Sequence, residues 1–179
     1  MSAILPPAER LWWKHPLDRV EGTWIVIALI WCLIMFAMMV GWHVWGKQNL
    51  STETYKTTPE KFTLKAQAMV DKYTVRTETA EKIPVVAPPP GSDVYLVARL
   101  WNFWPILELE KGKSYRLHLT SMDYNHGFSL QPVNINIQIV PGYEHVVNIT
   151  PNQSGTYSVV CNEFCGINHH TMVSRIYVK

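Results

Sequence analysis

The sequence predicts one transmembrane α-helix followed by a small all-β domain, a Greek-key barrel or sandwich. Three observations predict this class. Residues 22–46 contain no Asp, Glu, Lys or Arg; apolar and polar residues alternate with a period of two after Gly91; and turn signals recur at short intervals in that second region. The chain has 179 residues, of which 47% are hydrophobic and 17% charged. This composition excludes a disordered chain and a protein that crosses a membrane many times.

The apolar stretch is long enough to cross a lipid bilayer. Its residues 23–42 alone, at a rise of about 1.5 Å each, span about 30 Å, which is the thickness of a hydrocarbon core. Tryptophans flank the stretch, as expected for residues at the headgroup layer: Trp12, Trp13 and Trp24 on one side, and Trp42 and Trp45 on the other. A cleaved signal peptide is disfavoured because the run is too long and lacks a small-residue cleavage site. We therefore expect a permanent anchor.

Four regions follow from these patterns. Residues 1–21 form an N-terminal cytoplasmic segment and residues 22–46 the transmembrane helix. Residues 47–91 are polar at first and rich in proline at their end, which predicts a linker with a short helix that starts near Pro59. Residues 92–179 form the folded domain. Positive charges lie on both sides of the helix, so charge alone does not set its orientation.

The folded domain is expected to contain about six short strands. The alternating segments lie near residues 94–100, 115–120, 133–139, 145–149, 156–160 and 173–178. Turn signals at 110–113, 141–142 and 152–155 separate them. So many short strands in so few residues favour a Greek-key sandwich over a fold that alternates helices and strands.

Charge and cysteine content narrow the function. The net charge is +2 and no basic stripe is present, which argues against nucleic acid as a partner. The chain has three cysteines, so they cannot all pair within it. They are better explained as metal ligands or reactive groups, except for Cys32, which lies inside the apolar stretch as a packing residue.

One short segment concentrates the candidate ligands. Between residues 161 and 172 it holds two thiols, Cys161 and Cys165, an imidazole, His169, and a thioether, Met172. Thiolate and thioether sulfur together with imidazole form a soft ligand set that favours copper. A second histidine is expected from elsewhere in the fold, and His126 is the candidate, in a turn after the strand that ends near residue 120. A structural zinc site or a disulfide is the competing interpretation, but neither explains the thioether and the distant histidine together.

The spacing of these residues resembles a known family. Cys161-x-Glu163-x-Cys165-Gly166-x-x-His169-x-x-Met172, preceded by Asp123-x-x-His126-Gly127-Phe128, resembles the binuclear CuA motif in subunit II of haem-copper oxygen reductases, the cytochrome c oxidases. The resemblance extends over residues 92–179 and implies a cupredoxin domain. A single membrane helix resembles the B type of these enzymes, whereas the glutamate at position 163 is typical of the A type.

The resemblance also implies a ligand set. Cys161 and Cys165 would bridge two coppers. His126 and Met172 would complete the shell of one copper, and His169 and the backbone carbonyl of Glu163 would complete that of the other. In A-type enzymes the carboxylate at the position of Glu163 also helps to bind Mg²⁺ at the interface with subunit I.

The function implied by the resemblance is electron transfer. The domain would accept electrons from a cytochrome c and pass them to haem in subunit I, where O₂ is reduced and protons are pumped. Trp101 or Trp104 would mark the surface where electrons arrive. A periplasmic donor implies an inner-membrane protein with its N-terminus inside and its domain outside. Two alternatives remain open: the CuA subunit of a nitric oxide reductase, and a membrane-tethered copper-delivery protein.

Overall fold

The computed structural model describes residues 16–46 and 52–179. The chain divides into an N-terminal unit and a larger C-terminal unit that begins at Leu50. The expectations for residues 1–15, including Trp12 and Trp13, lie outside the described residues.

The N-terminal unit contains one long helix, α1 (Arg19–Trp45), of 27 residues. It begins with a capping box. The Asp18 carboxylate accepts a hydrogen bond from the Glu21 backbone N–H at 2.7 Å, and the Glu21 carboxylate accepts one from the backbone N–H of Asp18 at 3.2 Å. None of its residues is buried within the protein, and its length and mean hydropathy suit a membrane span. The expected helix is confirmed and begins three residues earlier than predicted.

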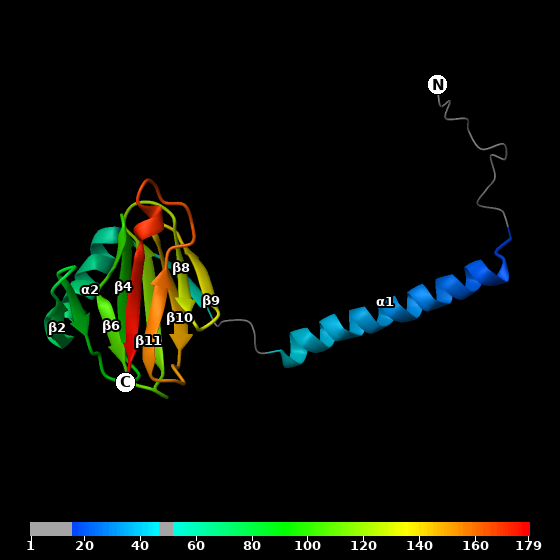
Figure 1. Ribbon diagram of the computed structural model, residues 1–179, viewed down its shortest axis with the longest axis horizontal. Coiled ribbons are helices and arrows are strands. Elements are labelled where there is room, and N and C mark those ends of the chain that lie inside the picture. Colours follow the sequence, from blue (N-terminus) through cyan, green and yellow to red (C-terminus); the bar gives the residue numbers. More distant parts are fainter. Residues whose placement is uncertain (1–15, 47–51) are drawn as a thin grey trace, which may run out of the picture. The chain divides into compact units, whose positions relative to one another are not determined.

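The C-terminal unit consists of two β-sheets with one helix against them (Figure 1). The first sheet has the strand order β1-β10-β7-β4-β5 and the second has the order β2-β3-β6-β12-β11-β8-β9. The first sheet's strands are β1 (Thr52–Lys56), β4 (Asp93–Arg99), β5 (Asn102–Trp104), β7 (Tyr115–Ser121) and β10 (Tyr143–Ile149). Those of the second are β2 (Thr74–Glu78), β3 (Ile83–Val86), β6 (Ile106–Leu109), β8 (His126–Gln131), β9 (Ile135–Ile139), β11 (Gly155–Val160) and β12 (Val173–Val178).

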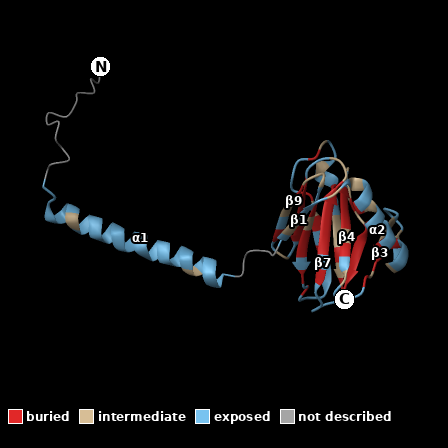
Figure 2. Cartoon of the chain, turned by 180° about the vertical axis from the view of Figure 1, so that it is seen from behind, coloured by how far each residue is buried: buried red, intermediate tan, exposed pale blue. Residues whose placement is uncertain are grey.

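The main hydrophobic core fills the space between the two sheets (Figure 2). In β4 and β7, for example, alternate residues point inward, which is the period of two found in the sequence. Leu96 and Leu117 enter the core from the first sheet, and Phe128, Val159 and Ile176 enter it from the second. The predicted all-β sandwich is confirmed, and its six strands correspond to β4, β7, β9, β10, β11 and β12.

A second, smaller core lies on the outer face of the first sheet. Helix α2 (Pro59–Tyr73) buries Phe62 and Ala66 there against Val97 of β4. Thr58 caps this helix by accepting a hydrogen bond from the Lys61 backbone N–H, and a proline occupies the first turn, as the sequence predicted.

Residues 47–91 were expected to form a linker, but their described part belongs to the folded domain. Its described residues form β1, α2, β2 and β3, all of which belong to the two sheets or pack on them. β1 is a polar edge strand, TETYK, held by antiparallel pairing with β10. Such a strand has no apolar alternation, so the sequence carries no sign of it. The compact domain therefore begins near residue 50, before the predicted Ser92.

Candidate metal centre

The candidate ligands reach one point from three strand ends. His126 is the first residue of β8, and Cys161 directly follows the last residue of β11. The chain then forms a loop through Cys165 and a short 3₁₀ helix, η2 (His169–Thr171), and reaches Met172 just before β12. The loop is closed at its base, because the Cys161 backbone N–H donates to the Met172 carbonyl at 3.1 Å. β11 and β12 are paired neighbours, so the two ends of the loop are held together.

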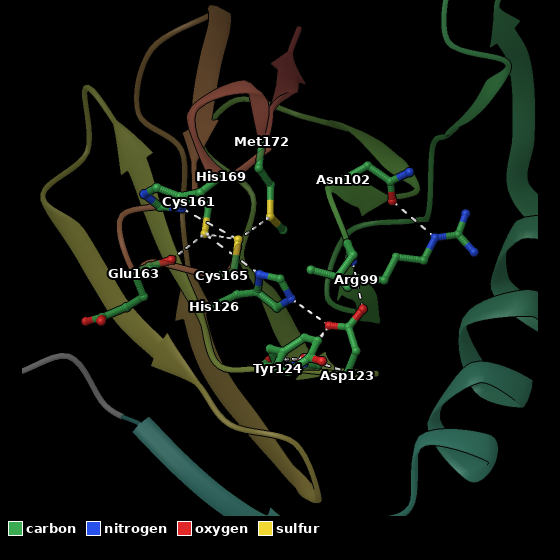
Figure 3. Close-up of polar contacts among 12 residues, drawn as sticks. Arg99, Asn102, Asp123, Tyr124, His126, Cys161, Glu163, Cys165, His169 and Met172 are labelled. Carbon is green, nitrogen blue, oxygen red and sulfur yellow. Dashed lines mark hydrogen bonds and ion pairs between the residues drawn. The ribbon is translucent and has the colours of Figure 1, made fainter. Parts of the chain in front are cut away.

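The side chains converge on the two cysteine sulfurs (Figure 3). The Sγ atoms of Cys161 and Cys165 are 3.8 Å apart. The Sγ atom of Cys161 lies 3.8 Å from the Nδ1 atom of His126 and 3.3 Å from the backbone oxygen of Glu163. The Sγ atom of Cys165 lies 3.5 Å from His169 Nδ1 and 3.7 Å from Met172 Sδ. All six residues predicted to be ligands are therefore in one cluster.

Four of the six residues are shielded from solvent, whereas His169 is half-buried and Glu163 is exposed. His126 and Met172 are fully buried, and Cys161 and Cys165 are 4% and 6% exposed. Among the residues that the structure describes, His126, Cys161 and Cys165 form one group whose donor atoms lie within 4.8 Å of one another. Both cysteines are free thiols. A sulfur separation of 3.8 Å is far beyond the ~2.05 Å of a disulfide bond.

Asp123 fixes the orientation of His126. Its Oδ1 atom accepts a hydrogen bond from His126 Nε2 at 2.7 Å, so Nδ1 faces the sulfurs with a free lone pair. The same carboxylate accepts hydrogen bonds from the backbone N–H groups of Leu100 and Tyr124, each at 2.7 Å. Burial favours the protonated acid, but these hydrogen bonds outweigh it and hold the pKa of Asp123 below its usual value. The Asp123-x-x-His126 spacing was visible in the sequence, but the role of the aspartate was not.

The thiols lie in a site that disfavours negative charge. Burial, together with the neighbouring thiol of Cys161, raises the pKa of Cys165 to about 11. A cation bound between the sulfurs would reverse this preference, because a metal ion stabilises the thiolate that ligates it.

A hollow of about 740 Å³ opens beside the sulfurs. It is lined by Trp101, Asp123, Tyr124 and Cys165, among others, and by Phe164 and Ile167, which are 82% and 87% exposed. The Trp101 indole is close to Gly166, where φ is +116°, and its buried Nε1 has no hydrogen-bond partner in the described structure.

The second tryptophan predicted at this surface is placed elsewhere. Trp104 pairs with Val97 in the first sheet, packs against both the main and the smaller core, and is not among the residues that line the hollow. Of the two, Trp101 is therefore the one beside the candidate ligands.

The donor set fits copper. Both sulfurs can reach a common metal ion, because 3.8 Å is less than twice a metal–thiolate bond of about 2.3 Å. The thioether of Met172 is fully buried and faces Cys165. A structural zinc site does not need such a thioether ligand. The other strand histidines do not join the cluster. His118, for example, has its Nδ1 atom 2.5 Å from a Glu144 carboxylate oxygen.

Comparisons with known proteins agree with this geometry. Residues 105–178 match the family model described as cytochrome c oxidase subunit II, periplasmic domain. Cytochrome c oxidase subunit 2 of Thermus thermophilus is 34% identical over 115 residues, which cover 62% of this chain and 85% of that protein. The chain belongs to the family of cytochrome c oxidase subunit II.

Two further relatives extend the comparison. A probable cytochrome c oxidase subunit 2 of Streptomyces coelicolor is 38% identical over 77 residues, which are 43% of this chain and 24% of that protein. Among solved structures, a chain of a haem-copper terminal oxidase dimer matches with a TM-score of 0.56 and 25% identity, and the match covers 90% of this chain and all of that one. As a subunit II, this chain is one subunit of a terminal oxidase, and it carries a cluster of residues suited to copper.

Proposed function

We propose that the cluster holds a binuclear CuA centre through which the chain supplies electrons to its oxidase. Cys161 and Cys165 would bridge the two coppers. His126 and Met172 would complete the shell of one copper, and His169 and the backbone carbonyl of Glu163 that of the other. The single observation that carries this proposal is the pair of free, buried thiols 3.8 Å apart, each with its own imidazole nitrogen within 3.8 Å. A mononuclear blue-copper site uses one cysteine, so the second thiol has no place in it.

Two coppers that share two thiolates would spread one electron over the pair, so that each bond changes little between the oxidised and reduced forms. The chain contributes rigidity. A hydrogen bond to Asp123 fixes the His126 ring, and the loop is anchored between two paired strands. Burial of His126, Cys161, Cys165 and Met172 keeps water away from these donors, and no general acid, base or nucleophile is required.

We further propose the route of the electrons. The donor is a cytochrome c, as the name of the family states, and the acceptor is haem in subunit I, which reduces O₂ and pumps protons. The donor meets the surface around Trp101, since this indole lines the hollow that reaches Cys165. Trp104 lies apart from that hollow and is not part of the proposed route.

The same proposal sets the orientation in the membrane. Helix α1 crosses the inner membrane once, with residues 1–21 inside and the domain on the periplasmic side. The matched family model describes a periplasmic domain, which supports this direction. A single crossing supports a B-type subunit. The carboxylate of Glu163 points away from the sulfurs, and only its backbone oxygen faces Cys161 (Figure 3). That carboxylate is thus free to help bind Mg²⁺ against subunit I.

The experiment is electron paramagnetic resonance of the full chain, purified in detergent and loaded with copper. We expect a hyperfine pattern from two equivalent copper nuclei. A pattern from a single nucleus, or zinc alone by elemental analysis, would contradict the proposal.

The alternatives are separated by other measurements. A nitric oxide reductase would share every ligand, so the co-purified catalytic subunit and its consumption of O₂ or NO decide between the two. A copper-delivery protein must release its metal to an acceptor. His126, Cys161, Cys165 and Met172 are 0–6% exposed, and their burial opposes rapid release. Retention of copper against a chelator supports electron transfer.

A further inference from the structure

Two residues that directly follow candidate ligands are in unusually close contact. Gly127 follows His126, and Asn162 follows Cys161. A methyl group on Gly127 would lie 1.9 Å from Asn162 Oδ1, 2.9 Å from its Cγ and 2.9 Å from its backbone nitrogen. Gly127 is not among the glycines with positive φ. What this position requires is therefore the absence of a side chain rather than a special backbone conformation.

The reason lies in the strand order. β8 lies between β11 and β9 in the second sheet. The last register pair of β11 with β8 is Val160↔Ser129, so the chain continues along the first residues of β8 as Cys161 and Asn162. The amide of Asn162 donates to Asn136 Oδ1 at 2.8 Å, and Asn136 belongs to β9, on the far side of β8. The Asn162 side chain thus crosses β8 over Gly127 to reach the next strand.

We propose that Gly127, Asn162 and Asn136 form a strap that positions Cys161 against His126, an inference that rests on the proposed copper function. The strap joins the start of the ligand loop to the sheet at the point where the loop leaves β11. It acts between the two residues whose donor atoms, Cys161 Sγ and His126 Nδ1, are 3.8 Å apart. These three are positioning residues, since none of them supplies a ligand atom.

The close approach makes the strap sensitive to one methyl group. Rotation of the Asn162 side chain would relieve the contacts with Oδ1 and Cγ but not the one with its backbone nitrogen. Substitution of Gly127 by alanine therefore displaces the backbone beside Cys161. Loss of the Asn162 amide instead removes one exposed hydrogen bond and leaves the packing unchanged, which is a smaller effect.

The test uses Gly127→Ala, Asn162→Ala and the double variant in the full chain. For Gly127→Ala we expect an altered electron paramagnetic resonance spectrum. We also expect a copper affinity lower by about 10- to 100-fold, measured by competition with a chelator. For Asn162→Ala the loss is smaller. The double variant recovers part of the affinity lost in Gly127→Ala, because Oδ1 and Cγ are no longer present to collide. Gly22→Ala, where no atom lies within 4 Å of the added methyl, is the matched control.

A second readout needs no metal. Cys161 is 4% exposed, so displacement of the loop should speed its alkylation in the metal-free chain, as followed by peptide mass mapping. Unchanged alkylation and affinity in Gly127→Ala, or a double variant no better than Gly127→Ala, would overturn the strap. If Gly127→Ala does not fold, Asn162→Ala and Asn136→Ala test it alone: equal, small losses support it, and no loss in either overturns it. Failure of the proposed function shows itself separately, as a wild-type chain without a paired copper signal.

Discussion

Buried polar groups lie beside both ends of strand β12, and the two groups are stabilised in different ways. At the C-terminal end, the Glu108 carboxylate of the adjoining strand β6 is 8% exposed and forms ion pairs with Arg76 and Lys179. At the other end, the sulfurs of Cys161 and Cys165 have sulfur, imidazole nitrogen and carbonyl oxygen atoms at 3.3–3.8 Å, and the nearby charge is the negative one of Asp123.

The pKa directions express this difference. Burial alone would raise the pKa of Glu108, but hydrogen bonds from Lys179 and Arg76 outweigh it and lower the pKa. No cation offsets burial at Cys165, whose pKa is raised. The chain itself completes the cluster around Glu108, whereas the sulfur cluster lacks a positive charge that a metal would supply. An ion cluster completed by the chain indicates a structural role, and an incomplete one indicates a binding site.

The largest expected effect comes from removing one sulfur. Cys161→Ser should abolish the paired copper signal and electron uptake, because one thiolate cannot bridge two metals alone. The protein should remain in the membrane fraction, since α1 is unchanged. Cys32→Ser is the matched control and should keep full copper content. Normal electron uptake by Cys161→Ser, measured with a reduced cytochrome c, would contradict the ligand assignment.

A smaller effect is expected at the aspartate that orients His126. Asp123→Ala removes the acceptor for His126 Nε2 and for two backbone N–H groups. Copper affinity should fall by about 10- to 100-fold, as is usual for a group that orients a metal ligand. Asp123→Asn keeps an oxygen acceptor and should lie between wild type and Asp123→Ala. Equal affinities for all three chains would refute this role.

At the opposite end of β12 the expected effect concerns stability and not copper. Glu108→Gln should lower the free energy of unfolding by on the order of 1–2 kcal/mol at neutral pH, because the ion pairs with Arg76 and Lys179 are lost. Copper affinity should be unchanged. Denaturant unfolding measures the first quantity and chelator competition the second.

The loss of stability in Glu108→Gln should depend on pH. The folded-state pKa of Glu108 is below its ordinary value of 4.5. The contribution of Glu108 to the free energy of unfolding is complete above pH 4.5 and disappears as the pH falls toward and through the folded-state pKa. The difference between wild type and Glu108→Gln should therefore shrink on acidification below that pH. A difference that grows with acid would be inconsistent with this sign.

The smallest effect is expected at the neighbour of a candidate ligand. His170 is exposed and has no hydrogen bond or ion pair in the described structure, whereas the ring of His169 lies 3.5 Å from Cys165 Sγ. His170→Ala should leave stability within about 0.5 kcal/mol of wild type and copper affinity unchanged. His169→Ala should lose copper. Similar losses in both variants would show that adjacent histidines were assigned in the wrong order.

Local patterns were sufficient to predict much of this protein. A run of residues without charge predicted α1, and apolar alternation predicted β4, β7, β9, β10, β11 and β12, because each pattern reports directly on whether lipid or a core covers the element. The ligand segment could be recognised because five of the six candidate ligands lie within twelve consecutive positions; His126 is the exception.

Other elements could not be predicted from a pattern in the sequence. β1 is polar, and β6 is buried at all four positions, so neither alternates. His126 was expected in a turn, but it begins β8, because pairing with β9 extends this strand to the candidate metal centre. Strand pairing between distant segments depends on backbone hydrogen bonds, which the side-chain pattern of one segment does not encode.

The amino-acid sequence alone determined the membrane-length helix, the sandwich class and the chemical types of the candidate ligands, since hydrophobicity and donor type are properties of individual side chains. The tertiary structure decided which of these side chains meet. It selected Trp101 over Trp104 at the hollow, gave Asp123 its hydrogen bond to His126, and placed Gly127 beneath Asn162. Each of these contacts joins segments that only the pairing and stacking of two sheets bring together.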